Sequence, residues 1–106
     1  MKWPQLHSFV AVAEEESFTG AARRLGVSQP EVSRRVRQLE RQVGAKLVQR
    51  TTRQVTITAA GREVLRWAVR TIDGWERVNR RLDGYRSPSD PRSEGIDSSK
   101  EKKRVD

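Results

Sequence analysis

The sequence has no cysteine and a single histidine, His7. The missing thiols exclude disulfides, cysteine-ligated zinc and thiol nucleophiles. No glycine-rich phosphate loop, nucleophile–base pair or metal-ligand spacing stands out among the other residues. The acidic run Glu14–Glu16 is interpreted as a solvated stretch and not as a pair of catalytic carboxylates. We therefore expect neither an enzyme nor a protein that holds a metal ion or cofactor.

Long apolar runs are missing too. Hydrophobic residues make up 34 % of the 106 residues, and no stretch of them approaches a bilayer-spanning length. The N-terminus has no apolar signal-peptide core, and the basic part of the chain lacks the apolar face of a membrane-surface helix. These absences predict a cytoplasmic protein without a membrane partner.

Acidic residues are scarce where basic residues gather. The net charge is +8, and residues 1–86 carry all of it, with 17 basic and 9 acidic residues. Residues 23–53 hold nine basic residues, mostly arginine, and two acidic ones. Arginine presents a planar fork that suits phosphates and guanine edges, so this concentration favours a nucleic acid as partner. A generally basic, solvated surface is the alternative.

Three helices are expected before residue 45. Pro4 suits the first turn of a helix over residues 4–13, and Ser17 is a suitable N-cap for a helix over 18–25. Gly26 allows a sharp exit, and Ser28 with Glu31 predicts a capping box at the start of a third helix that reaches Val43. The positions expected inside are Leu6, Phe9, Val10, Ala13, Phe18, Ala21, Ala22, Leu25, Val32, Val36, Leu39 and Val43.

The rest of the chain predicts a hairpin, a long helix and a tail. Two short strands are expected at 47–49 and 55–57, joined by a basic turn, and Thr58 should cap a helix reaching about Tyr85. Residues 87–106 are rich in serine, proline and charge, so they are expected to be disordered. We predict a mainly α protein with a winged helix-turn-helix at 1–58, a linker and dimerisation helix at 59–86, and a tail at 87–106.

The spacing of Ala22, Gly26 and Val32 is typical of a helix-turn-helix. The run SFTGAARRLGVSQPEVSRRVRQLERQVG resembles the N-terminal DNA-binding domain of LysR-type transcriptional regulators, over roughly residues 4–62. Val48 departs from this family, which usually has phenylalanine there. The resemblance implies transcription regulation at the nucleoid of a bacterium or archaeon, with double-stranded DNA as the partner.

The outer face of the third helix and the wing supply the candidate DNA contacts. The resemblance assigns base recognition to Gln29, Pro30, Ser33 and Arg34, and the length of Arg37 adds it to this set. Contacts to phosphate or the minor groove are assigned to Ser17, Ser28, Arg35, Arg50, Thr52 and Arg53. Several roles stay open: Gln29 and Ser33 as plain solvated residues, Glu31 as a cap or a cytosine contact, Arg41 on phosphate or in solvent, and Arg23 and Arg24 on phosphate or exposed. Glu40 is interpreted as a structural salt-bridge or capping partner.

An apolar stripe on the long helix predicts a second helix packed against it. Its members are Leu65, Ala68, Ile72, Trp75, Asn79 and Leu82, with Asn79 as the polar residue that fixes register. Family members pair these helices antiparallel, which implies a homodimer at an inverted-repeat operator. Packing of the helix onto its own domain, with Val64 and Trp67, is the alternative.

Family members continue into a two-lobed effector-binding domain, which residues 87–106 do not resemble. We accordingly expect a regulator without a ligand-sensing domain and without a small-molecule ligand. The competing function is a protein-interaction role, in which the chain forms heterodimers with a full-length relative and modifies or antagonises it.

Overall fold

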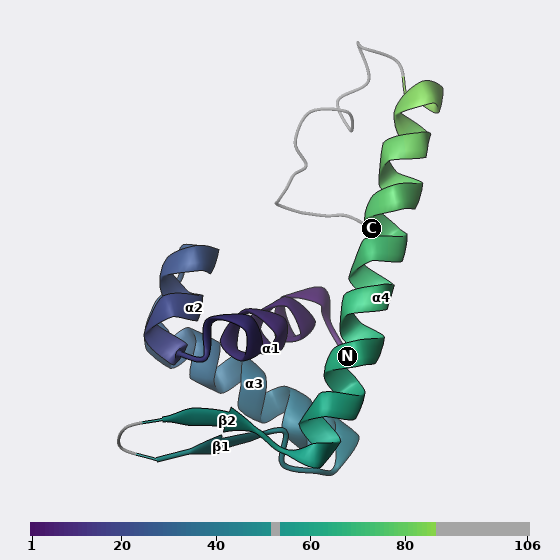
Figure 1. The fold of residues 1–106 in the computed structure, drawn as a ribbon. Helices are drawn as coiled ribbons and strands as arrows, with labels where there is room; N and C mark the ends of the chain where they lie inside the picture. The colour runs from purple at the N-terminus through teal and green to yellow at the C-terminus, as the bar shows by residue number, and fades with distance from the viewer. Residues whose placement is uncertain (52–53, 87–106) are drawn as a thin grey trace. The chain divides into compact units, whose positions relative to one another are not determined.

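The computed structural model describes residues 1–51 and 54–86, which form four α-helices and a two-stranded sheet (Figure 1). The elements are α1 (Trp3–Glu15), α2 (Phe18–Leu25), α3 (Gln29–Val43), β1 (Val48–Arg50), β2 (Val55–Ile57), α4 (Ala59–Leu82) and a short 3₁₀ turn, η1 (Asp83–Tyr85). This confirms the predicted fold class. The first helix is longer than expected at both ends, and β1 begins one residue later. The tail predicted at 87–106 lies outside the described residues.

The described residues divide into two compact units, one over Met1–Thr71 and one that begins at Ile72. The first unit contains the three helices, the hairpin and the first half of α4. The second contains, among the described residues, the rest of α4 and η1. The division at residue 58 stays a prediction, and residues 59–71 belong to the first compact unit.

Side-chain caps and left-handed residues fix the helix ends. The Ser17 hydroxyl accepts a hydrogen bond from the Gly20 N–H at 2.8 Å, and the Ser28 hydroxyl accepts one from the Glu31 N–H at 3.2 Å. Gly26 and Gly44, with φ of 70° and 76°, end α2 and α3 in a conformation that disfavours a Cβ atom. The predicted starts and ends of α2 and α3 are confirmed.

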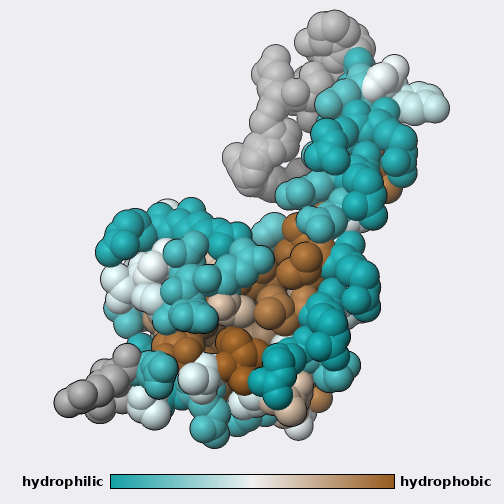
Figure 2. All heavy atoms as spheres, viewed as in Figure 1, coloured by the Kyte–Doolittle hydropathy of each residue, from teal (hydrophilic) through white to brown (hydrophobic). Residues whose placement is uncertain are grey.

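The core of the first unit forms where α1 packs against α2 and α3. Its largest fully buried apolar side chains are Phe9, Val12, Val32, Leu39 and Leu47. Val43 was expected to be buried but is 36 % exposed, because it is the last residue of α3 and the chain leaves the core at Gly44. In the view of Figure 2, hydrophobic side chains gather where α1 and the first half of α4 lie, with hydrophilic side chains around them.

A hydrogen-bonded junction joins the hairpin to α4. The strands are antiparallel, with Val48 opposite Ile57. The Leu47 carbonyl accepts from the Thr58 N–H at 3.1 Å. The Thr58 hydroxyl donates to the Lys46 carbonyl at 2.6 Å and accepts from the Gly61 N–H at 2.9 Å, which confirms it as the predicted cap. A Cβ on Gly61 would lie 2.2 Å from the Leu47 carbonyl oxygen. The first turn of α4 therefore lies so close to the Leu47 backbone that only glycine fits at this position.

The described part of the second unit ends with a local side-chain network. Arg86 donates through Nη2 to Asn79 Oδ1 at 2.7 Å and through Nη1 to Asp83 Oδ1 at 2.9 Å. Two apolar side chains remain exposed on this half of α4: Trp75 at 45 % and Val78 at 39 %. Across residues 1–51 and 54–86, none of the helices combines the length and the apolar character needed to cross a membrane.

Candidate nucleic-acid interface

The outer face of α3 carries a stripe of exposed side chains. Pro30, Arg34, Arg37 and Arg41 recur at intervals of three or four residues, so they lie along one side of the helix, and all four are exposed. The opposite side carries the buried residues Val32, Val36 and Leu39. α3 is thus held by its apolar side and presents arginine outward, as a helix that enters a DNA groove must.

At the N-terminus of α3, the exposed Gln29 side chain is held by α2. Thr19 donates its hydroxyl hydrogen to Gln29 Oε1 at 3.2 Å. This contact orients the amide group at the helix end that usually meets base edges in helix-turn-helix proteins. Thr19 was absent from the residues predicted from sequence. Its place one residue into α2 carries no pattern that distinguishes it from an ordinary surface threonine.

Glu31 binds two arginines in the first turns of α3. Its carboxylate accepts from Arg34 Nε at 3.0 Å and also from Arg34 Nη2, and it accepts from Arg35 Nε at 2.9 Å. The hydrogen bonds from Arg34 and then Arg35 lower the pKa of Glu31, and the hydrogen bond to Glu31 raises the pKa of Arg34. Ser28 forms its half of the predicted capping box, but the Glu31 carboxylate is engaged by these arginines.

Ser33 and Arg50 form a contact between α3 and the wing. Ser33 was expected on the exposed face, yet only 8 % of it is exposed. Arg50 Nη1 donates to Ser33 Oγ at 3.4 Å, and the Arg50 guanidinium lies 4.1 Å from the centre of the Phe18 ring. This cation–π contact ties β1 to α2 as well as to α3. The other two wing residues predicted to contact DNA, Thr52 and Arg53, lie outside the described residues.

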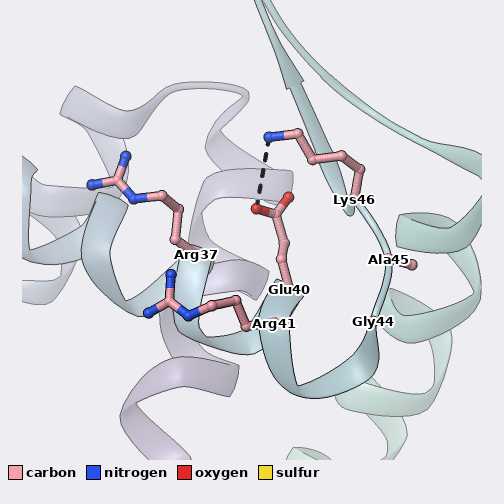
Figure 3. Close-up of a pocket in the computed structure, with 6 residues that line it drawn as sticks. All are labelled: Arg37, Glu40, Arg41, Gly44, Ala45 and Lys46. Carbon is pink, nitrogen blue, oxygen red and sulfur yellow. Dashed lines mark ion pairs between the residues drawn. The ribbon is translucent and has the colours of Figure 1, made fainter.

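A shallow depression near the end of α3 is rimmed by positive charge. It is lined by Arg37, Glu40, Arg41, Gly44, Ala45 and Lys46. In Figure 3 the long side chains of Arg37 and Arg41 extend from α3, and Lys46 reaches toward Glu40, with 3.9 Å between Nζ and Oε1. Lys46 was not among the predicted DNA contacts.

Glu40 has the structural role predicted for it. Its Oε2 accepts from the backbone N–H groups of Leu47 and Val48 at 2.9 and 3.2 Å, so it holds the start of β1 against α3. Arg24, by contrast, lies 2.9 Å from Glu14 and 3.3 Å from Glu15, and the hydrogen bond that it donates to Glu14 raises its pKa. In the free chain Arg24 therefore pairs with carboxylates at the end of α1.

The predicted dimerisation stripe varies in exposure along α4. Ala68 is fully buried within the chain, so it has no surface to offer a second copy, and Ile72 is 8 % exposed. Leu65 and Leu82 are half-buried. Trp75 is 45 % exposed, and the half-buried Asn79 is bound by Arg86. Trp67, named as a packing residue in the alternative, is instead 42 % exposed.

Comparison with known proteins identifies the family. Residues 3–62 match the family described as bacterial regulatory helix-turn-helix protein, lysR family. The uncharacterized HTH-type transcriptional regulator YnfL of Escherichia coli strain K12 is 53 % identical over 60 residues, which cover 57 % of this chain and 20 % of YnfL. The HTH-type transcriptional regulator TfdT of Cupriavidus pinatubonensis is 46 % identical over 81 residues, covering 76 % of this chain and 36 % of TfdT.

Solved structures of DNA complexes have the same fold. The CbnR DBD–DNA complex has a TM-score of 0.76 at 38 % identity and covers 80 % of this chain and 98 % of that one. The BenM DBD complex with catB site 1 DNA has a TM-score of 0.77 at 33 % identity, and the match covers 80 % of this chain and 96 % of the BenM chain. The chain spans 20 % and 36 % of the lengths of YnfL and TfdT. It belongs to the LysR family of bacterial helix-turn-helix regulators and carries that family's winged helix-turn-helix DNA-binding domain.

Proposed function

We propose that this chain binds duplex DNA sequence-specifically as a homodimer at an interrupted inverted repeat, and so regulates transcription. The observation that carries the proposal is the exposed stripe on α3, which begins at Pro30 and continues through Arg34, Arg37 and Arg41. An arginine fork can bind guanine O6 and N7 together, and the major groove is wide enough for a helix.

The position of a residue along α3 suggests which part of the DNA it contacts. Gln29, Pro30 and Arg34 lie in the first turns of α3, which approach base edges most closely in helix-turn-helix proteins. Arg37 lies midway, where its length allows contact with a base or a phosphate. Arg41, with Lys46 nearby at the depression, is proposed to contact the phosphate backbone, which positions the protein without selecting sequence.

Ser33 and Arg50 take a different part in this proposal. Since Ser33 is buried beneath Arg50, its small side chain lets the wing arginine lie against α3. Arg50 also contacts the Phe18 ring, so its guanidinium reaches the DNA surface from a fixed position. Ser17 and Ser28 cap α2 and α3. The backbone N–H groups at the N-termini of these two helices are suited to donate hydrogen bonds to DNA phosphate oxygens. Arg35 donates a hydrogen bond to Glu31 and is proposed to lie near the phosphate backbone of the DNA.

The homodimer is supported by the apolar surface on α4 beyond residue 71. Trp75, Val78 and Leu82 recur at helical spacing, and the first two are 45 % and 39 % exposed. A helix half that exposes such residues is stabilised when a second apolar face covers it. A two-fold dimer would present two copies of α3, with half-sites about 34–36 Å apart or a multiple of that spacing.

Selection from randomised duplexes tests DNA recognition. The purified chain should enrich an inverted repeat, and Arg34→Ala should relax the preference at one position of each half-site by roughly tenfold or more. Arg66→Ala, on α4, is the matched control and should select the same sites as the wild type. An unchanged preference in Arg34→Ala would refute the role given to Arg34.

Light scattering tests the dimer. Trp75→Arg places a charge in the proposed contact and should give a folded monomer with much weaker affinity for the selected site. Glu76→Arg introduces the same side chain at the neighbouring exposed position and should remain a dimer. An intact dimer in Trp75→Arg would exclude this surface as the interface.

A further inference from the structure

One carboxylate at the start of α3 accepts hydrogen bonds from two arginines. Glu31 binds Arg34 through two hydrogen bonds, one to each carboxylate oxygen, and binds Arg35 through a third. The side chains differ in exposure: Arg34 is 53 % exposed, whereas Glu31 and Arg35 are 29 % and 22 % exposed. Arg34 is therefore the outer member of the group, nearest to an approaching duplex.

The two-point contact with Glu31 uses the same guanidinium geometry that DNA would use. An arginine binds guanine through two parallel hydrogen bonds, and it binds a carboxylate or phosphate in the same way. Arg34 donates to Glu31 from Nε and from Nη2. To bind guanine with that edge of its fork, Arg34 must leave Glu31.

Whether Arg34 leaves Glu31 depends on how the affinity gained from a DNA contact compares with the loss of the ion pair. An exposed ion pair changes an equilibrium constant by at most a few-fold. A bidentate guanine contact discriminates against other bases by about 5- to 150-fold, so it exceeds the loss of the pair. A contact with a phosphate is itself an exposed ion pair of the same small value, so it gains little over the pair with Glu31 that it replaces. Glu31 thus competes effectively with phosphate and poorly with guanine.

Arg35 keeps Glu31 paired when Arg34 departs. Its Nε lies 2.9 Å from Glu31 Oε2, one turn along the helix from the carboxylate and with less exposure than Arg34. The carboxylate charge is therefore still balanced once Arg34 has turned toward the groove. Without Arg35, an uncompensated negative charge would face the phosphates in the complex.

We propose that Glu31 is a specificity-determining positioning residue: it withholds Arg34 from sequence-independent phosphate contacts and releases it to the correct base. This inference rests on the proposed function, in which α3 enters the major groove. Glu31 contacts no base in this scheme. It acts through Arg34, so its removal should strengthen binding to arbitrary DNA more than binding to the selected site.

The test compares Glu31→Gln with Glu63→Gln. Glu63 forms an ion pair with Arg66 at 2.6 Å, three residues apart as Glu31 and Arg34 are. Each variant therefore removes one carboxylate charge, from one such pair at Glu63 and from the group shared with Arg34 and Arg35 at Glu31. The probes are a duplex obtained by selection with the wild type and a scrambled duplex of the same composition. Binding of each is measured by fluorescence anisotropy over a series of salt concentrations.

Glu31→Gln should lower the ratio of specific to non-specific affinity several-fold. Its log–log salt slope on scrambled DNA should steepen by about 0.9, the value of one added phosphate contact. Glu63→Gln should leave the ratio as in the wild type. In an Arg34→Gln background, Glu31→Gln should no longer change the ratio, which a merely structural role for Glu31 would not predict.

Three results would overturn the inference. Equal ratios and salt slopes for Glu31→Gln and Glu63→Gln would show that Glu31 does not restrain Arg34. A new preferred base at one position, in place of weaker preference, would show that Glu31 contacts that base itself. A wild type that selects no sequence would refute the proposed function, and this inference with it.

Discussion

Gly61→Ala should destabilise the domain although alanine favours helix. Gly61 lies in the first turn of α4, where a Cβ would be 2.2 Å from the Leu47 carbonyl oxygen and 2.5 Å from Ile57 Cγ2. Unbonded carbon atoms in contact lie about 3.5 Å apart or more. The substitution therefore has to move the Leu47 carbonyl or the start of α4 by about 1 Å.

The size of the effect follows from three contributions. Overpacking a well-filled site costs about 1–3 kcal/mol. Displacing the Leu47 carbonyl weakens the 3.1 Å hydrogen bond from the Thr58 N–H, at about 1 kcal/mol. The higher helix propensity of alanine offsets about 1 kcal/mol. The net loss in free energy of unfolding is about 1–3 kcal/mol, which lowers the melting temperature of a domain this size by roughly 4–24 °C.

Thermal unfolding followed by circular dichroism measures this loss, with Gly74→Ala as the matched control. Gly74 lies in the same helix, but the nearest atom to its Cβ would be Arg77 Nη2, at an ordinary contact distance of 3.8 Å. Gly74→Ala should leave the melting temperature unchanged or raise it slightly. A Gly61→Ala protein that melts with the wild type would show that the junction yields without strain, and would refute the reasoning.

Two further predictions concern buried polar groups. The Ser8 hydroxyl is fully buried and has no hydrogen-bond partner among the residues that the structure describes. Ser8→Ala should therefore raise the free energy of unfolding in urea by about 1 kcal/mol, and a loss of stability would contradict this. Glu40→Ala leaves the Leu47 and Val48 N–H groups unsatisfied next to the core and should lower the same quantity by about 2–4 kcal/mol. Lys46→Ala removes only the ion-pair partner of Glu40, whose Nζ lies 3.9 Å from Glu40 Oε1, and should change the free energy of unfolding little.

The helices and their ends were predictable because their signals are local. Ser17 and Ser28 cap neighbouring N–H groups, and Gly26 and Gly44 adopt conformations that few other residues accept. Apolar spacing identified most of the core for the same reason. Even the function of Thr58 as a cap could be predicted, since its partner lies three residues away.

The candidate site was less predictable because its geometry depends on distant residues. Ser33 occupies a polar position in the sequence pattern, yet Arg50, seventeen residues later, covers it. The contact of Thr19 with Gln29 joins two helices and leaves no periodic trace in the sequence. The sharing of Glu31 between Arg34 and Arg35 depends on side-chain conformations that spacing alone leaves open.

On α4 the helical period was predicted correctly, but not which residues the chain itself buries. Ala68 belongs to the apolar stripe and is nonetheless fully buried, whereas Trp67, one residue earlier, is 42 % exposed. A stripe identified from sequence cannot separate a surface that packs within the chain from one that meets a second copy. Both kinds require apolar residues at the same spacing.

The stacking of Arg50 on Phe18 and over Ser33 has a consequence for how this protein can evolve. The three residues come from β1, α2 and α3, so a change in any one alters the surroundings of the other two. A larger residue at 33 would push the arginine off the ring, and loss of the ring would leave the arginine to swing away. New operator preferences should therefore arise through joint replacement of these positions, and single exchanges there should be poorly tolerated.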